Sequence, residues 1–129
     1  MAIVSIGSDI AAIERLRAAI ERRGERLLER LFTPGERSYC EARAASATHY
    51  AGRFAAKEAV MKVLGTGWRR GVRWIDIEVV RAPGAAPELR LYGESARIAA
   101  RRGIERIHVT ITHDAGVALA LAVGEGPGA

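Results

Sequence analysis

A carboxylate and an ammonium group stand one helical turn apart in the middle of the chain, at Glu58 and Lys62. Residues at positions i and i+4 share one face of a helix, and Glu before Lys is the favoured order for an ion pair worth about 0.2–0.5 kcal/mol. Spacing alone favours this helix-stabilising interpretation. The functional alternative requires a polyanion, because a carboxylate beside an ammonium can hold a divalent metal ion and a phosphate together.

Asp9 is the candidate for a second carboxylate. It follows the apolar run 3–6 and Gly7, so we expect it just past the end of a short buried strand, where loops carry chemistry. Mg²⁺ prefers oxygen ligands and usually takes one or two carboxylates together with substrate phosphates. Nothing in the spacing brings Asp9 to Glu58, which lies 49 residues later.

Two further groups stand at predicted element ends. His113 ends a predicted strand, where a histidine satisfied at a turn is the simpler interpretation and a donor to a phosphate or an adenine is the alternative. The segment Gly65-Thr66-Gly67 follows a predicted helix, and a glycine C-cap explains it most simply. It matches neither a P-loop nor a dinucleotide fingerprint, which disfavours those nucleotide folds.

The net charge of +5 is built almost entirely from arginine, since only Lys57 and Lys62 among the 20 basic residues are lysines. Lys57 lies on a different helix face from Lys62, and we interpret it as an ion-pair partner that orients a neighbouring carboxylate. Much of the arginine gathers early in the chain, at Arg15, Arg22, Arg23, Arg26 and Arg30. This basic surface either is simply solvated or meets an acidic partner. An acidic protein helix fits at least as well as nucleic acid, because only 5% of the residues are aromatic.

The spacing of apolar residues, which predicts the helices and strands that position these side chains, changes along the chain. Apolar residues at helical spacing predict a helical segment over 11–31, with a bend at Gly24. A capping box formed by Thr33 and Glu36 begins a second helix, and a longer helix over about 49–64 carries Glu58 and Lys62. The remaining predictions are a helix over 94–102 and strands over 3–6, 74–80, 89–92, 107–111 and 117–123. The fold class is therefore α+β, with helices packed on an antiparallel β-sheet in a single compact domain.

Length and composition exclude several classes of protein. The 129 residues fit one domain, which we place at residues 1–124, with a short flexible tail at 125–129. The apolar runs are far shorter than the roughly 20 residues that span a bilayer, and no signal peptide is visible. The lone Cys40 cannot form an internal disulfide, and we interpret it as a core residue. We expect a cytoplasmic protein with neither a membrane nor a nucleic acid as its partner.

One long motif and several short ones resemble a known family. The segment Ala51-Gly52-Arg53-Phe54-Ala55-Ala56-Lys57-Glu58-Ala59, followed by Lys62 and Gly65-Thr66-Gly67, closely resembles the signature of the holo-acyl-carrier-protein synthases, the small 4′-phosphopantetheinyl transferases. Segments 6–10, 32–36, 76–79 and 109–114 resemble the family's other motifs, in the same order. The resemblance covers nearly the whole chain. Ser8 replaces a usual apolar residue and Thr112 a common serine, and neither change removes a proposed ligand.

The resemblance implies a 4′-phosphopantetheinyl transferase-like fold and a reaction. The family transfers 4′-phosphopantetheine from coenzyme A to a serine of an apo acyl carrier protein, using Mg²⁺ and releasing adenosine 3′,5′-bisphosphate. Asp9 and Glu58 would ligate the metal, and Lys62 would neutralise the pyrophosphate, so these three form the catalytic group. Contacts to coenzyme A would come from Lys62, Gly65, Thr66, His113 and Arg53. Contacts to the carrier protein's acidic helix would come from Arg15, Arg22 and Arg26.

The resemblance also implies a homotrimer with active sites at the subunit interfaces. Glu58, directly or through water, is our candidate for the base that takes the serine proton. Two other functions stay open. A basic nucleic-acid-binding module would show steep salt dependence and need no metal. A catalytically silent scaffold for carrier proteins would keep the arginines and tolerate the loss of Asp9 and Glu58. The sequence does not distinguish fatty-acid from polyketide carriers.

Overall fold

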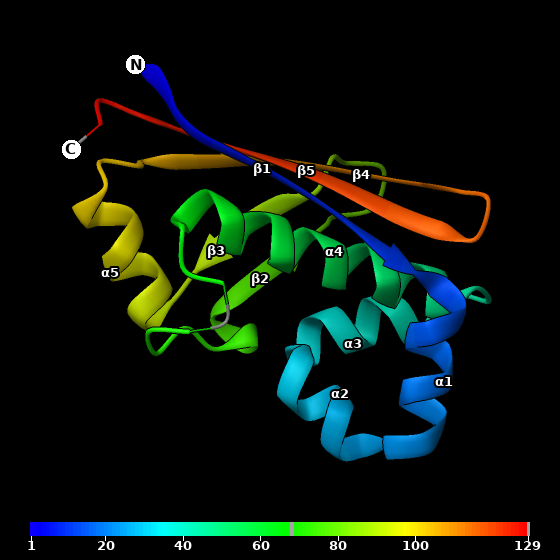
Figure 1. Ribbon diagram of the computed structural model, residues 1–129. Coiled ribbons are helices and arrows are strands. Elements are labelled where there is room, and N and C mark those ends of the chain that lie inside the picture. Colours follow the sequence, from blue (N-terminus) through cyan, green and yellow to red (C-terminus); the bar gives the residue numbers. More distant parts are fainter. Residues whose placement is uncertain (68, 129) are drawn as a thin grey trace.

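Helix α4 (Ser46–Leu64) runs through the middle of the molecule, and the other elements pack around it (Figure 1). The computed structural model describes residues 1–67 and 69–128. An antiparallel sheet in the order β1–β5–β4 covers one side of α4, and its strands are β1 (Ala2–Ala12), β4 (Arg106–Asp114) and β5 (Val117–Gly126). A separate antiparallel pair, β2 (Ile77–Val80) with β3 (Glu88–Leu91), also contacts α4 through β2.

The shorter helices gather at the two ends of α4 (Figure 1). At one end lie α1 (Ile13–Arg23), α2 (Glu25–Leu31) and α3 (Pro34–Glu41), and at the other lies α5 (Gly93–Arg101). Gly24 separates α1 from α2 with a positive φ of 65°, a conformation in which glycine carries no steric penalty. The predicted capping box is confirmed, since Thr33 and Glu36 bond each other's backbone N–H groups at the start of α3.

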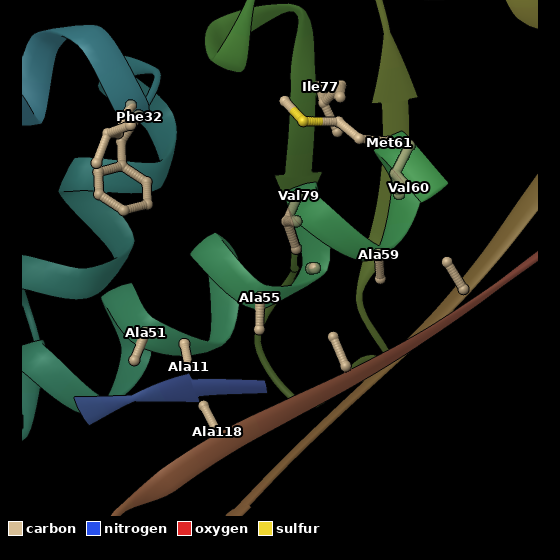
Figure 2. Close-up of a cluster of buried hydrophobic side chains, with 14 of the residues drawn as sticks. Ala11, Phe32, Ala51, Ala55, Ala59, Val60, Met61, Ile77, Val79 and Ala118 are labelled. Carbon is tan, nitrogen blue, oxygen red and sulfur yellow. The ribbon is translucent and has the colours of Figure 1, made fainter. Parts of the chain in front are cut away.

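Small side chains let α4 lie close against the sheet. Alanines spaced four residues apart on α4 face alanines spaced two apart on β5, as Figure 2 shows in part. All of them are fully buried: Ala51, Ala55, Ala59, Ala118, Ala120 and Ala122. Gly7 on β1 belongs to the same contact, because a Cβ at that position would lie 2.3 Å from the backbone oxygen of Ala59. The close approach of β1 to α4 therefore depends on a missing side chain.

The α+β class and the order of elements agree with the sequence prediction, but several details differ. Strand β1 continues through Gly7 to Ala12, so Asp9 lies within a strand and not past its end. Gly7 does not stop the strand; it admits α4. Residues Trp74–Asp76 form a 3₁₀ turn, η1, where we expected the start of a strand. Helix α4 begins at Ser46 without a side-chain cap, three residues earlier than predicted. The strands also form two sheets and not one.

The C-terminal strand is longer than its sequence pattern indicates. β5 pairs with β1 as far as Gly126, and the N–H of Gly128 donates to the oxygen of Gly103. Regular structure thus continues past residue 124, while the flexible tail at 125–129 stays a prediction. Within the described residues, no helix combines the length and apolar character needed to cross a membrane.

Candidate functional site

Three of the predicted residues meet where β1 crosses α4. The Lys62 Nζ lies 3.0 Å from Asp9 Oδ1 and donates to the oxygen of Ser8 at 2.8 Å. Glu58 lies one helical turn before Lys62 and faces the same cavity as Asp9. The partner of Lys62 is therefore Asp9, and not the Glu58 that spacing alone favoured. The crossing at Gly7 supplies the proximity that the 49-residue separation could not predict.

The charge of Asp9 makes the nearby Glu58 carboxyl harder to ionise. Burial, then a hydrogen bond with Asp9, then the negative charge of Asp9 raise the pKa of Glu58 from its ordinary value of 4.5 to about 7, and the charge of Lys62 offsets part of this. A cation placed between the carboxylates would relieve the same repulsion that the proton relieves now. Near neutral pH the pair is thus poised between holding a proton and holding a cation.

The donor set suits a hard divalent cation that completes its coordination from elsewhere. Over residues 1–67 and 69–128, no group of three or more His, Cys, Asp or Glu side chains is placed to hold a metal ion. Asp9 and Glu58 would contribute two carboxylates, leaving further positions for substrate oxygens and water. Mg²⁺ is the ion that binds in this manner, whereas structural zinc sites require four protein ligands.

A cavity of about 630 Å³ opens beside the carboxylates, between β1, α1, α2 and α4. Its walls include Arg15 and the aromatic rings of Phe54 and Trp74. The predicted Arg22 and Arg26 are exposed outside this lining. Two other arginines, Arg23 and Arg30, line the cavity instead. Arg15, Ala19 and Arg23 stand at four-residue intervals, and this spacing is the sequence signal that places Arg23 on the same helix face as Arg15.

A second cavity, of about 220 Å³, contains the predicted Arg53 and His113 together with Arg81. Arg53 is only 3% exposed, and its Nε is buried without a hydrogen-bond partner among residues 1–67 and 69–128. Its guanidinium carbon lies 4.1 Å from the centre of the Tyr39 ring, which holds it by a cation–π contact. Burial, followed by the charges of Arg53 and other nearby cations, lowers the pKa of His49 beside it. An orphaned donor in a positive cavity suits an anionic group.

Gly65 and Thr66 lie at the C-terminal end of α4, beyond Lys62. Gly65 adopts the left-handed conformation with φ 77°, and its N–H bonds the oxygens of Met61 and Lys62, which confirms the C-cap interpretation. Thr66 Oγ1 donates to the oxygen of Gly67 at 2.8 Å. Neither residue lines either of the two cavities.

One chain does not bring all predicted residues together. Glu58 and Arg53 are five positions apart on α4, about 140° around the helix axis, so they face different sides of it. Asp9, Glu58, Lys62 and Arg15 gather on one side, while Arg53 and His113 share the other cavity.

Cys40 lies elsewhere in the core, fully buried, and burial raises its pKa to about 12, which confirms its structural role.

Comparison with known proteins identifies what this chain resembles over almost its whole length. A family profile described as the 4′-phosphopantetheinyl transferase superfamily matches residues 5–122. A holo-[acyl-carrier-protein] synthase of Desulforudis audaxviator is 50% identical over 125 residues, covering 97% of this chain and 95% of that relative. One from Anaeromyxobacter sp. strain K is 51% identical over 129 residues, covering 98% of each.

Solved structures agree with the sequence relatives. The holo-[acyl-carrier-protein] synthase of Neisseria meningitidis superimposes with a TM-score of 0.86 at 28% identity, covering 96% of this chain and 99% of that one. The Helicobacter pylori enzyme, solved in complex with coenzyme A, gives a TM-score of 0.81 at 32% identity, covering 93% and 99%.

Proposed function

The chain belongs to the holo-[acyl-carrier-protein] synthases of the 4′-phosphopantetheinyl transferase superfamily, and we propose that it transfers 4′-phosphopantetheine from coenzyme A to a serine of an apo acyl carrier protein. The meeting of Asp9, Glu58 and Lys62 beside an arginine-lined cavity is the observation that carries this proposal. The Helicobacter pylori relative, with its bound coenzyme A, supports the choice of donor.

The three residues divide the chemistry of phosphoryl transfer. The serine oxygen bonds the β-phosphorus of coenzyme A, the bond from that phosphorus to the bridging oxygen breaks, and adenosine 3′,5′-bisphosphate leaves with the electron pair. Glu58, directly or through water, takes the serine proton as the proposed general base, because its carboxylate faces the cavity in which the carrier's serine would lie. Lys62, fixed by Asp9 and the Ser8 oxygen, places positive charge beside the departing pyrophosphate oxygen.

Mg²⁺ is the metal that we propose for this site, with Asp9 and Glu58 as its protein ligands. When bound, it would neutralise pyrophosphate charge and lower the barrier to departure of the leaving group. The raised pKa of Glu58 supports this assignment, because a divalent cation held by both carboxylates would offset the repulsion between their charges.

The arginines around the first cavity suit the carrier protein. Arg15, Arg23 and Arg30 line the wall next to the carboxylates, so an acidic helix docked there would present its serine to Glu58. Arg22 and Arg26, exposed on the neighbouring surface, extend the positive area and remain proposed contacts. The charge complementarity would steer encounter and fix orientation more than it would add affinity.

The residues that we propose for coenzyme A binding and those that we propose for the chemistry lie in different cavities of one chain. This separation supports an active site that is shared between two chains. We propose that Arg53 and His113 bind its adenosine-phosphate end and that Gly65 and Thr66 line its path. Exposed apolar side chains cover the outer face of β1 and β5: Ile6 64%, Ile10 58%, Leu119 41% and Leu121 40%. A contiguous apolar patch of this kind marks an interface. A homotrimer would bury it and bring the two cavities of neighbouring chains together.

The decisive experiment incubates the protein with coenzyme A, Mg²⁺ and an apo carrier protein and measures the carrier's mass. We expect a gain of one phosphopantetheine, abolished by chelation and by Glu58→Gln, while the exposed Glu105→Gln stays active as the matched control. A carrier that binds but gains no mass, whether a fatty-acid or a polyketide carrier is offered, would favour the silent scaffold. Salt-sensitive binding of nucleic acid, without transfer of phosphopantetheine, would favour the nucleic-acid-binding module.

A further inference from the structure

Lys57 forms a buried ion pair that the proposed chemistry does not use. Its Nζ lies 2.7 Å from Glu36 Oε1, and both side chains are completely buried. The sequence predicted an ion pair that orients a neighbouring carboxylate. The ion pair is confirmed, but its partner is Glu36 on α3, 21 residues earlier, and not the adjacent Glu58.

The remaining hydrogen bonds of this pair connect four elements. Lys57 Nζ on α4 donates to the backbone oxygens of Trp74 at 2.9 Å and Ile77 at 2.6 Å. Glu36 accepts from the N–H of Val79 at 2.8 Å and from that of Thr33 at 2.9 Å. The pair therefore ties α4 and the start of α3 to η1 and β2.

Stability alone does not explain such a pair. Removing two charges from water costs several kcal/mol for each ion, and replacing a buried ion pair by matched uncharged groups is often neutral or stabilising. A buried pair therefore needs another explanation, and the geometric consequence of its hydrogen bonds supplies one.

Lys57 fixes the backbone of Trp74, and Phe54 fixes its ring. The Phe54 and Trp74 rings are stacked, with centroids 5.0 Å apart and an angle of 17° between their planes. Both rings line the cavity that also contains Asp9 and Glu58. Phe54 lies one helical turn before Glu58 on α4, so the stacked rings and the carboxylate share one rigid support.

We propose that Lys57 and Glu36 are positioning residues that hold the Phe54–Trp74 stack in place as the apolar wall of the carrier-protein cavity. This rests on the proposed function and deepens it. The wall serves the carrier and not coenzyme A, because both rings line the cavity that contains Arg15 and neither lines the one that contains His113. The apolar side chains of an amphipathic acidic helix would pack against the stack while its carboxylates meet the arginines.

The test replaces both charges at once, with the variant Lys57→Met/Glu36→Gln. Glutamine suits the same capping-box position, and removing both ions leaves neither charge unpaired, so the double variant should unfold close to the parent temperature. The chain contains two tryptophans, so a Trp68→Phe background leaves Trp74 as the sole tryptophan, which can be excited selectively over the tyrosines. We expect acrylamide to quench Trp74 about twice as efficiently once its carbonyl is released.

Kinetics provide the second readout. The KM for the apo carrier protein should rise about tenfold in the double variant, while the KM for coenzyme A stays unchanged. Trp74→Leu, which leaves the Lys57–Glu36 pair intact, should cause the same selective rise, and this variant keeps the test usable if the double variant does not fold. The matched control is Ile98→Ala, which removes buried volume from α5 at the other end of the molecule and should change neither KM.

Several results would overturn the proposal. In the double variant, these are unchanged quenching together with an unchanged carrier KM, or an equal rise in both KM values. An unchanged carrier KM in Trp74→Leu would also overturn it. So would a selective rise in the carrier KM in the control Ile98→Ala. The quenching measurement needs no turnover. Suppose that the protein does not transfer phosphopantetheine, but the double variant still shows increased acrylamide quenching of Trp74. This result would contradict the proposed function and would still support the positioning of Trp74 by Lys57.

Discussion

Glu58 is the residue whose chemistry depends most on its surroundings. Its partly buried carboxyl hydrogen-bonds Asp9, and together with burial this raises its pKa to about 7. Lys62 offsets only part of the shift, because its side chain is 57% exposed and already paired with Asp9. A proton would thus compete with the proposed divalent cation for the same oxygens, and that competition can be measured in two ways.

The first measurement concerns stability without metal. The folded-state pKa of Glu58 exceeds its ordinary value of 4.5, so the folded protein holds the proton more tightly and loses stability as pH rises from about 4.5 to 7. Glu58→Gln should therefore stabilise the protein at pH 8, by about 1 kcal/mol after discounting for solvent screening of a partly exposed group, and much less at pH 5. Urea denaturation in chelator at both pH values checks this, with Glu105→Gln as control. An equal effect at the two pH values would contradict it.

The second measurement concerns the metal itself. Carboxylate ligands must lose their proton to bind a cation, so the affinity for Mg²⁺ should weaken about tenfold for each pH unit below about 7. Binding to the folded state alone also raises the unfolding temperature by mass action. Titration calorimetry at pH 6 and 8 measures the first effect, and thermal unfolding with and without Mg²⁺ measures the second. Asp9→Asn should lose both, and a pH-independent affinity would exclude Glu58 as a ligand.

At the scale of elements, the crossing of β1 over α4 creates the site. A Cβ on Gly7 would lie 2.3 Å from the Ala59 oxygen and 2.8 Å from the Lys62 Cβ, so a side chain there must push the strand and helix apart. The same displacement would separate Asp9 from Lys62 and Glu58. The stability of this crossing and the proposed catalysis therefore both depend on the absence of a Cβ at Gly7.

Gly7→Ala should destabilise the protein by about 2–3 kcal/mol, at the upper end of overpacking costs, and should lower transfer more than stability alone predicts. Gly35→Ala is the matched control, because its Cβ would lie 3.4 Å from the nearest atom, in ordinary contact. Urea denaturation gives the first quantity and carrier mass analysis of the folded variant gives the second. A Gly7→Ala protein with parental stability and activity would show that β1 can shift without cost.

Local patterns predicted the elements well and their contacts poorly. The capping box at Thr33 and the glycine C-cap at Gly65 were predictable because a few neighbouring residues determine them. The continuation of β1 through Gly7 was not, since the reason lies on α4, more than 50 residues away. The partner of Lys57 is likewise set by tertiary packing, and no spacing within its own helix indicates Glu36. The motif resemblance named the candidate site residues, while the fold showed which of them one chain assembles.

At the scale of the whole molecule, α4 separates two half-sites. One cavity holds Asp9 and Glu58, the other holds Arg53 and His113, and the apolar face of β1 and β5 is left exposed. A closed homotrimer accounts for both features, because each interface could join one cavity to the other cavity of the next chain. In that arrangement no chain is active alone, and damage to the two half-sites can be placed on different chains.

Subunit mixing tests this arrangement directly. Glu58→Gln removes the proposed base, and Arg53→Ala/His113→Ala removes two proposed coenzyme A contacts, so each protein alone should transfer poorly at low coenzyme A. Refolding the two together in equal amounts should restore about a quarter of parental activity, since random mixing leaves that share of interfaces with both halves intact. Mixing Glu58→Gln with Asp9→Asn is the control, because both changes damage the same half-site and no combination repairs it. If the first mixture recovers nothing while native mass spectrometry shows trimers that contain both variants, each active site belongs to one chain, and α4 must then move for Arg53 and Glu58 to meet the same coenzyme A.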